Sequence, residues 1–389
     1  MHLLCGGHVA DASGTRRADV AIEDGRISAI GTDDPALDEA SAERVTDVSG
    51  AYIAPGLIDS HVHLPMDGRP DVEGYLDDTA YMASYRAAEN LQAALSAGVT
   101  AVRELGSRET LAIDAATAVR EGAIEGPTVV AAGENVVMTG GHGYWFGREA
   151  DGPAEVRKAV REQLKAGAAV IKCMATGGVL TSGAQTGAPE LTPDELEALV
   201  ESASAKGVPT AAHAHGDRGI ENAVRAGITS IEHGTFMSRE TAELMADRGT
   251  YWVPTASALR GIVEHGVESG IPEEAVAKAE EAQEAFGTAF ENALSAGVRV
   301  AMGTDAGTPF NHFGDIPGEL SYMVEYGMTP EAALEAATVN AAELLGLDDV
   351  GLVASGYRAD LLVLEEDPNV DAAAWQSPTA VYKGGSQVR

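Results

Sequence analysis

The stretch 95–106, LSAGVTAVRELG, ends a run rich in Ala and Leu at a glycine and continues as a short apolar strand. The same pattern returns in LKAGAAVIKCM (164–174), SAKGVPTAAHAHG (204–216), VRAGITSIEHG (224–234), LMADRGTYWVPT (244–255) and LSAGVRVAMGTD (294–305). Glycine suits the left-handed position that closes a helix, and helices that alternate with strands at this spacing predict parallel βα units. GLIDSHVH (56–63) and GPTVVAAG (126–133) bring the number of predicted strands to eight.

Eight such strands favour a (β/α)8 TIM-like barrel over an open doubly wound sheet, because no glycine-rich dinucleotide loop follows the first strand. The two ends of the chain have a different texture, with short β-like pieces separated by Gly and Asp turns. We therefore predict an α/β fold in which residues 56–347 form the barrel. Residues 1–55 and 348–389 are expected to pair into a small β-sandwich domain.

Composition restricts the classes of protein to consider. The chain has 389 residues, of which 45% are hydrophobic, so it can bury a large core. It contains no window of eighteen apolar residues and no basic, apolar leader, so we predict a cytoplasmic protein with no membrane partner. Cys5 and Cys173 are too few for a disulfide scaffold or a cysteine-based zinc site.

The net charge is −34, from 60 acidic and 26 basic residues. Such a chain would repel a polyanion, so nucleic acid is not an expected partner. An acidic surface that is poor in lysine fits a high-salt cytoplasm, where salt screens the repulsion between carboxylates. A high-GC genome that favours Asp, Glu, Ala, Gly and Arg explains the composition equally well.

Side chains that can bind metals gather at the carboxyl ends of the predicted strands, where barrel enzymes carry their active sites. His61 and His63 are two residues apart and so share one face of the first strand. The later strands carry Lys172, His213, His215, His233 and Asp305. Five of the chain's ten histidines at strand ends, together with a carboxylate, indicate a metal site.

Lys172 lies in the middle of an apolar strand, AAVIKCMATGG (168–178). A buried ammonium costs several kcal/mol unless it is paired. A neutral lysine can instead react with carbon dioxide to give a carbamate, whose two oxygens can bridge two cations. Burial favours this reaction because it lowers the lysine pKa toward the neutral form. A buried lysine paired with an acid is the alternative.

These residues resemble the amidohydrolase superfamily, and within it the carboxylated-lysine, binuclear-metal branch that includes Xaa-Pro dipeptidase-like and imidazolonepropionase-like members. The matching segments, in order, are PGLIDSHVHL, VIKCMATGGV, AAHAHGDRGI, SIEHGTF, MGTDAGTP and GYRADLLVL. The resemblance implies that one metal is held by His61, His63 and Asp305, and the other by His213 and His233. Carboxylated Lys172 would bridge the two ions, and imidazole and carboxylate ligands suit zinc.

The activity that the resemblance implies is hydrolysis of an amide or peptide bond in a small substrate, such as an Xaa-Pro or Xaa-Arg/Lys dipeptide or an N-acyl amino acid. A hydroxide between the metals would attack the carbonyl, and Asp305 would pass its proton to the leaving nitrogen. His142, in the loop MTGGHGYWFG (138–147), would contact the substrate carbonyl or the developing oxyanion. A loop histidine that faces solvent is the alternative. His215 is expected to orient a neighbouring ligand rather than to bind metal itself.

Three further residues are candidates for substrate contacts. Tyr144, with Trp145 and Phe146, would form an apolar lid over the site or a simple packing cluster. Arg103 would bind a substrate carboxylate or form a structural salt bridge inside the barrel. Phe236 stands where relatives often have a tyrosine that hydrogen-bonds the scissile group, so this position lacks that donor.

Two other functions fit parts of the pattern. A single-metal imidazolonepropionase-like or deaminase-like hydrolase of a cyclic C–N bond would need the histidines and Asp305 but not Lys172. A non-catalytic barrel scaffold has no need to keep all six ligands, and this chain has them. A homo-oligomer is expected in either enzyme, since the exposed barrel helices of the superfamily commonly associate.

We predict that the unfolding temperature rises strongly from dilute buffer to molar potassium chloride, because salt screens the repulsion among the excess carboxylates. Circular dichroism melts across a salt series measure this, with an uncharged osmolyte as the control for general solvent effects. A flat salt dependence would support the genomic explanation of the composition instead.

Overall fold

The computed structural model describes residues 1–32 and 37–389 of the chain. The strands of these residues are β1 (His2–Cys5), β2 (His8–Asp11), β3 (Gly14–Arg17), β4 (Asp19–Glu23), β5 (Arg26–Gly31), β6 (Arg44–Asp47), β7 (Tyr52–Pro55), β8 (Leu57–Val62), β9 (Val99–Glu104), β10 (Thr128–Ala131), β11 (Asn135–Val137), β12 (Gly147–Glu149), β13 (Ile171–Met174), β14 (Thr210–Ala214), β15 (Ser230–His233), β16 (Tyr251–Val253), β17 (Leu361–Leu364), β18 (Ala380–Lys383) and β19 (Ser386–Gln387).

Helices alternate with the strands through the middle of the chain, as the sequence predicts. They are α1 (Ala80–Ser96), α2 (Leu111–Arg120), α3 (Gly152–Ala166), α4 (Pro193–Ser204), α5 (Asp217–Ala226), α6 (Arg239–Arg248), α7 (Ala256–His265), α8 (Glu273–Ala296), α9 (Gly318–Glu325), α10 (Pro330–Ala337) and α11 (Val339–Leu345). Short 3-10 helices are η2 (Glu39–Ser41), η3 (Glu73–Asp77), η4 (Tyr144–Phe146), η5 (Val267–Ser269), η6 (Phe313–Asp315) and η7 (Ala372–Gln376).

Glycines end several of these helices as expected. Gly227 follows α5 with φ 94° and Gly297 follows α8 with φ 74°, and each donates its N–H back to the last turn of its helix. Residues with a Cβ rarely adopt this left-handed conformation, so glycine stops the helix and turns the chain toward the next strand.

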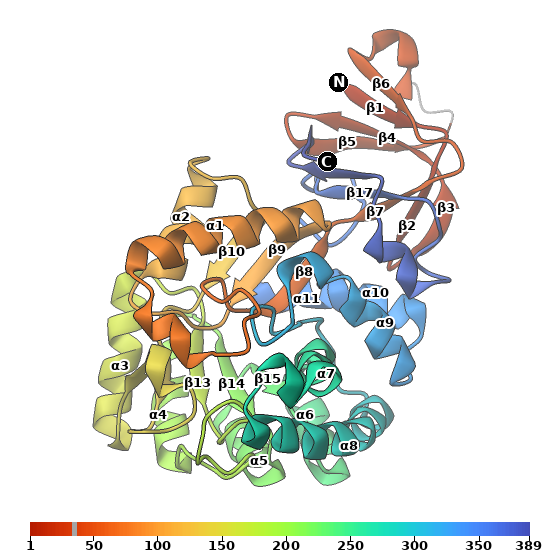
Figure 1. Ribbon diagram of the computed structural model, residues 1–389. Helices are drawn as coiled ribbons and strands as arrows, with labels where there is room; N and C mark the ends of the chain where they lie inside the picture. The colour runs from red at the N-terminus through yellow and green to blue at the C-terminus, as the bar shows by residue number, and fades with distance from the viewer. Residues whose placement is uncertain (33–36) are drawn as a thin grey trace.

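Parallel strands form the centre of the molecule. β8, β9 and β10 are neighbours in one sheet, and β11 and β13 to β16 follow one another in a second. The N–H of Ala169 donates to the carbonyl of Ala131 at 2.8 Å and links the two sheets after β10. On the other side, the segment 299–306 hydrogen-bonds to both β16 and β8. In Figure 1, α3, α4, α5 and α8 lie on the outer side of these strands.

The helices bury an apolar stripe against the strands, and α8 shows how. Phe286, Phe290 and Ala293 repeat at helical spacing and are buried. The ring of Phe290 lies 4.5 Å from that of Trp252 on β16, measured between centroids. Burial of large aromatic side chains contributes about 1.5–3 kcal/mol each, so this stripe holds α8 on the sheet.

The two ends of the chain share sheets away from these helices. A four-stranded sheet has the order β5-β4-β1-β6, and a six-stranded sheet has the order β19-β18-β17-β7-β2-β3. In the second, β7 from the N-terminal part pairs antiparallel with β17 from the C-terminal part. Apolar side chains of both sheets share one buried cluster, and Figure 1 shows both termini at these sheets.

No helix in residues 1–32 and 37–389 is both long and apolar enough to cross a membrane. Cys5 and Cys173 are free thiols.

Candidate metal centre

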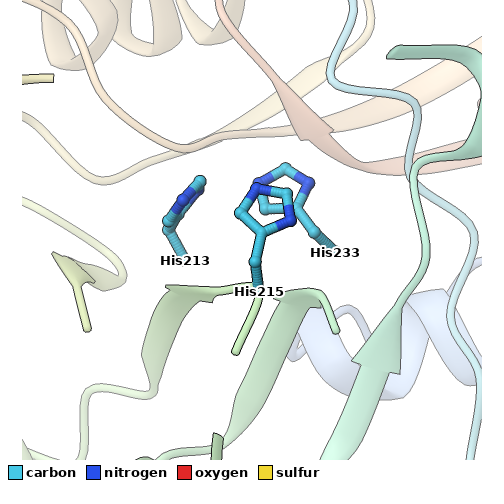
Figure 2. Close-up of side chains that lie close together, drawn as sticks. All are labelled: His213, His215 and His233. Atoms are coloured by element: carbon cyan, nitrogen blue, oxygen red, sulfur yellow. The ribbon is translucent and has the colours of Figure 1, made fainter. Parts of the chain in front are cut away.

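The side chains that the sequence places at strand ends meet in one cavity. Its lining includes His61, His63, His142, Lys172, His213, His215, His233 and Asp305. All of these residues are buried. Figure 2 shows the rings of His213, His215 and His233 close together at the ends of their strands. The cavity therefore gathers candidate ligands from β8, β13, β14 and β15 or the residues directly after them, and from the segment after β16 that carries Asp305.

Backbone strain is concentrated at this cavity. His233, Thr255 and Asp305 have φ angles of 69°, 59° and 61°. This left-handed region costs a residue with a Cβ about 1–2 kcal/mol. The strain at Asp305 is offset locally, because its N–H donates to the carbonyl of His61 at 2.7 Å and its carbonyl accepts from the Thr308 hydroxyl at 2.7 Å. Strain held in this way is typical of functional sites.

In three histidines, a hydrogen bond made by Nδ1 leaves the other ring nitrogen, Nε2, to face the cavity. The Nδ1 of His61 lies 2.9 Å from a carboxylate oxygen of Glu232, and the Nδ1 of His63 lies 3.0 Å from the carbonyl of Gly106. Both partners only accept, so each Nδ1 carries the proton. The Nδ1 of His233 also donates, since its partner Thr255 gives its own hydroxyl proton to Pro254. In all three rings Nε2 keeps a lone pair, as a metal ligand requires.

The donor atoms in the cavity fit a divalent metal. His61, His233 and Asp305 form one group whose ligand atoms all lie within 4.8 Å of one another, and His213, His215 and His233 form another. The Nε2 atoms of His61 and His63 lie 3.4 and 3.2 Å from Oδ1 of Asp305. That oxygen and Nε2 of His213 are buried without a hydrogen bond. Burial also lowers the pKa of His61 and of His215 to about 4, which keeps both rings neutral.

Lys172 lies beside these ligands and is 1% exposed. Within residues 1–32 and 37–389, no carboxylate oxygen lies within 4.0 Å of its ammonium nitrogen. Burial lowers its pKa to about 8. Among the described residues, Lys172 therefore has no close acid partner. The alternative explanation, a buried lysine paired with an acid, requires one.

His142 points into the cavity rather than into solvent. It is 7% exposed, and its ring centroid lies 4.3 Å from that of His213. Its Nδ1 lies 2.7 Å from the hydroxyl of Thr181, which also accepts from the N–H of Gly143. The Thr181 hydroxyl can donate its proton to Nδ1, and in that tautomer Nε2 carries the N–H. Gly178 makes room for this ring, since a Cβ there would lie 2.4 Å from Nε2.

Three of the predicted substrate contacts are not in the cavity lining. Arg103 is buried outside it, where it donates to Glu232 at 3.0 Å and to the Ser60 carbonyl at 2.6 Å, and these contacts favour the alternative of a structural salt bridge. Tyr144 is 41% exposed and points elsewhere, whereas Trp145 and Phe146 line the cavity. Phe236 is also absent from the lining.

The sequence analysis missed Glu232 and Asp59, which support the ligands from behind. Glu232 holds His61 as described, and Asp59 accepts from the N–H of His61 at 2.9 Å and from the Thr304 hydroxyl at 2.6 Å. Both acids are fully buried in apolar strands. The argument applied to Lys172, that a buried charge in an apolar strand needs an explanation, would have identified both.

Comparisons with known proteins identify relatives of the whole chain. The model of the amidohydrolase family matches residues 52–388. The ochratoxinase of Aspergillus niger is 34% identical over 370 residues, which cover 86% of this chain and 75% of that protein. A Xaa-Pro dipeptidase crystallised with methionine in its active site is 32% identical, with a TM-score of 0.93 over 99% of each chain. A prolidase complexed with N-methylphosphonate-L-proline is 31% identical, with a TM-score of 0.93 over 100% of this chain and 99% of that one.

The fold and its relatives define a hydrolase that acts on C–N bonds. The chain belongs to the amidohydrolase family.

We predict that Arg103→Met lowers the free energy of unfolding by about 3–5 kcal/mol, because it leaves Glu232 buried without its cation. Denaturant titration followed by circular dichroism measures the change. Arg225→Met is the matched control, since Arg225 forms an exposed pair with Glu221 whose loss is worth about 0–1 kcal/mol. Unchanged stability together with a raised KM would instead assign Arg103 to the substrate.

Proposed function

We propose that the protein is a binuclear metal-dependent amidohydrolase that cleaves the amide bond of a small substrate, the class that includes dipeptides and N-acyl amino acids. The observation that carries the proposal is the convergence of buried imidazole nitrogens on an Asp305 oxygen that receives no hydrogen bond. Relatives that are named as an ochratoxinase, a dipeptidase and a prolidase support an amide bond as the target.

The finer architecture of the proposal is a (β/α)8 barrel over residues 56–347 with a β-sandwich domain from residues 1–55 and 348–389. The hydrogen bonds of segment 299–306 to β16 and β8 support closure of the parallel strands into a barrel. The buried cluster shared by the two terminal sheets supports a sandwich. Assembly into a homo-oligomer and a cytoplasmic location stay predictions.

We assign the ligands as the sequence suggests, with zinc as the expected metal. His61, His63 and Asp305 would hold one ion, His213 and His233 the other, and a carbamate on Lys172 would bridge them. The neutral amine of Lys172 would attack carbon dioxide, form an N–C bond and release one proton. His215 would orient its neighbours, and the hydrogen bond of its Nδ1 to Thr235 at 2.7 Å fixes its ring.

When bound, two divalent ions lower the pKa of a water between them toward neutrality and so supply hydroxide to the reaction. Asp305 can accept the proton of this nucleophile. Burial raises the pKa of Asp305, but nearby groups, among them the Lys172 ammonium, lower it by more, so its pKa lies below the ordinary value and the carboxylate is ionised. Asp305 would then give the proton to the leaving nitrogen as the C–N bond breaks.

His142 would stabilise the charge that develops on the carbonyl oxygen. Burial lowers its pKa to about 3, so the ring is neutral, and with the Thr181 hydroxyl donating to Nδ1 its Nε2 would be the donor. A donor held in place before the reaction is worth about 2.7–4 kcal/mol of transition-state stabilisation. This position can supply the donor that Phe236 lacks.

Purified protein is predicted to hold about two divalent ions per chain, because six ligands exceed what one tetrahedral ion uses. Elemental analysis measures the content, and chelation should lower the unfolding temperature as well as the activity. His233→Ala should lower the metal content. The same substitution at the exposed His265 is the control. Saturation at one ion with full activity would favour the single-metal alternative.

Lys172→Ala is predicted to lose most activity and metal, and millimolar acetate or propionate should restore part of both, because these anions can replace the two carbamate oxygens. Lys158→Ala, at an exposed position, is the control and should not respond to carboxylates. Native mass spectrometry of the unmodified protein should show added carbon dioxide. Rescue by short alkylamines instead, with no carbamate, would identify Lys172 as a structural cation.

A further inference from the structure

The catalytic cavity has an apolar lining beyond its metal ligands. Trp145 and Phe146 come from η4, Val179 and Leu180 from the loop after β13, and Leu259 and Ile262 from α7. These side chains come from three separate segments, so the apolar character belongs to the cavity as a whole rather than to one element. Such a surface favours apolar groups on the substrate by about 25 cal/mol for each Å² removed from water.

The hydroxyl groups of the lining are already engaged. Thr235 and Thr255 each lie 2.7 Å from Nδ1 of a histidine, and the Thr308 hydroxyl donates to the carbonyl of Asp305 at 2.7 Å. Each of these hydroxyls therefore already has a part in positioning the site.

Cations are also missing from the described part of the lining. It contains no arginine, and its one lysine is Lys172 at the proposed metal centre. Arg103 is held outside the cavity by Glu232, and Lys278 near His142 is paired with Glu274 at 2.7 Å and donates to the carbonyl of Thr181 at 3.0 Å. A carboxylate on the leaving group would thus enter an apolar cavity without a side chain to neutralise it.

We infer that the preferred substrates are amides whose leaving amine is apolar and carries no free carboxylate. This inference rests on the proposed function, hydrolysis of an amide bond in a small substrate. Within that class it disfavours dipeptides and N-acyl amino acids, because their leaving amine carries a carboxylate. A carboxylate that is desolvated without a partner is strongly unfavourable, and the net charge of −34 adds repulsion at a distance. Asp305, a carbamate and a hydroxide would offset three of the four positive charges of two divalent ions, and the residues that would hold these ions are separate from the apolar side chains of the walls.

The reaction would consume one water. Its hydroxide forms a bond to the acyl carbon, the C–N bond breaks, and the nitrogen takes a proton, so the products are a carboxylic acid and an apolar primary or secondary amine. The carboxylate of the acid forms at the metal centre, where it has partners. The amine leaves through the apolar part of the cavity.

Two substrates that differ only in the carboxylate test the inference. N-acetyl-L-leucine and N-acetylisoamylamine release leucine and isoamylamine, which share the same branched chain. We expect kcat/KM to be at least about tenfold higher for the isoamylamide, in line with the cost of an unpaired buried charge. Calorimetric titration of metal-free protein with both compounds should show the same order of affinity. Equal or better use of N-acetyl-L-leucine would overturn the inference while it leaves the proposed function intact.

An added cation should reverse the preference. Leu259→Arg places a guanidinium on the α7 face of the cavity and should raise the relative kcat/KM for N-acetyl-L-leucine, whereas Leu259→Met should not. If neither compound nor any dipeptide is hydrolysed by metal-loaded protein, the proposed function fails, and the titrations of the wild-type chain still decide the inference. Tighter binding of the carboxylate compound to the metal-free wild-type chain would overturn it.

Discussion

The arrangement of the candidate metal centre depends on one buried carboxylate, that of Glu232. One of its oxygens accepts from Arg103 on β9 and from the Ser230 hydroxyl at 2.6 Å, and the other contacts the ring of His61 next to the cavity. Burial of this charge without partners would cost several kcal/mol, so the carboxylate needs all of its hydrogen-bond partners together. The carboxylate thereby joins three strands and sets the ring orientation of a ligand.

Asp59 plays a corresponding part where the chain closes on itself. Its carboxylate accepts from the N–H of His61, and from both the N–H and the hydroxyl of Thr304. Thr304 precedes Asp305, whose backbone is held in the left-handed region. The first and last ligands of the site, far apart in sequence, are therefore positioned by the same side chain.

The sequence predicted the helix–strand alternation and the residues that meet in the cavity, because glycine stops and strand-end histidines are local signals. It could not place Arg103 or Tyr144, since which face of a strand or loop meets the cavity depends on tertiary packing. The hydroxyls of Thr181, Thr235 and Thr255 carried no sequence signal, because threonine is common and only distance reveals which ring each one contacts. The buried acids could have been found, since each interrupts an apolar strand.

Two parts of the cavity therefore have different constraints. The candidate ligands lie on or beside strands. His61, His63 and His233 are each held by a hydrogen bond at Nδ1, and Asp305 is held in strained backbone, so the geometry of these four residues tolerates little change. The walls come from η4, the loop after β13 and α7, where apolar side chains can be exchanged at a cost in packing alone. In the described part of the chain these walls carry no arginine, and the chain as a whole is acidic. A guanidinium, the simplest group for binding an anionic substrate, is therefore missing from the walls. The catalytic chemistry depends on residues on or beside the strands, and the substrate selectivity depends on the walls. Substitutions in the walls can therefore change the selectivity without changing the chemistry.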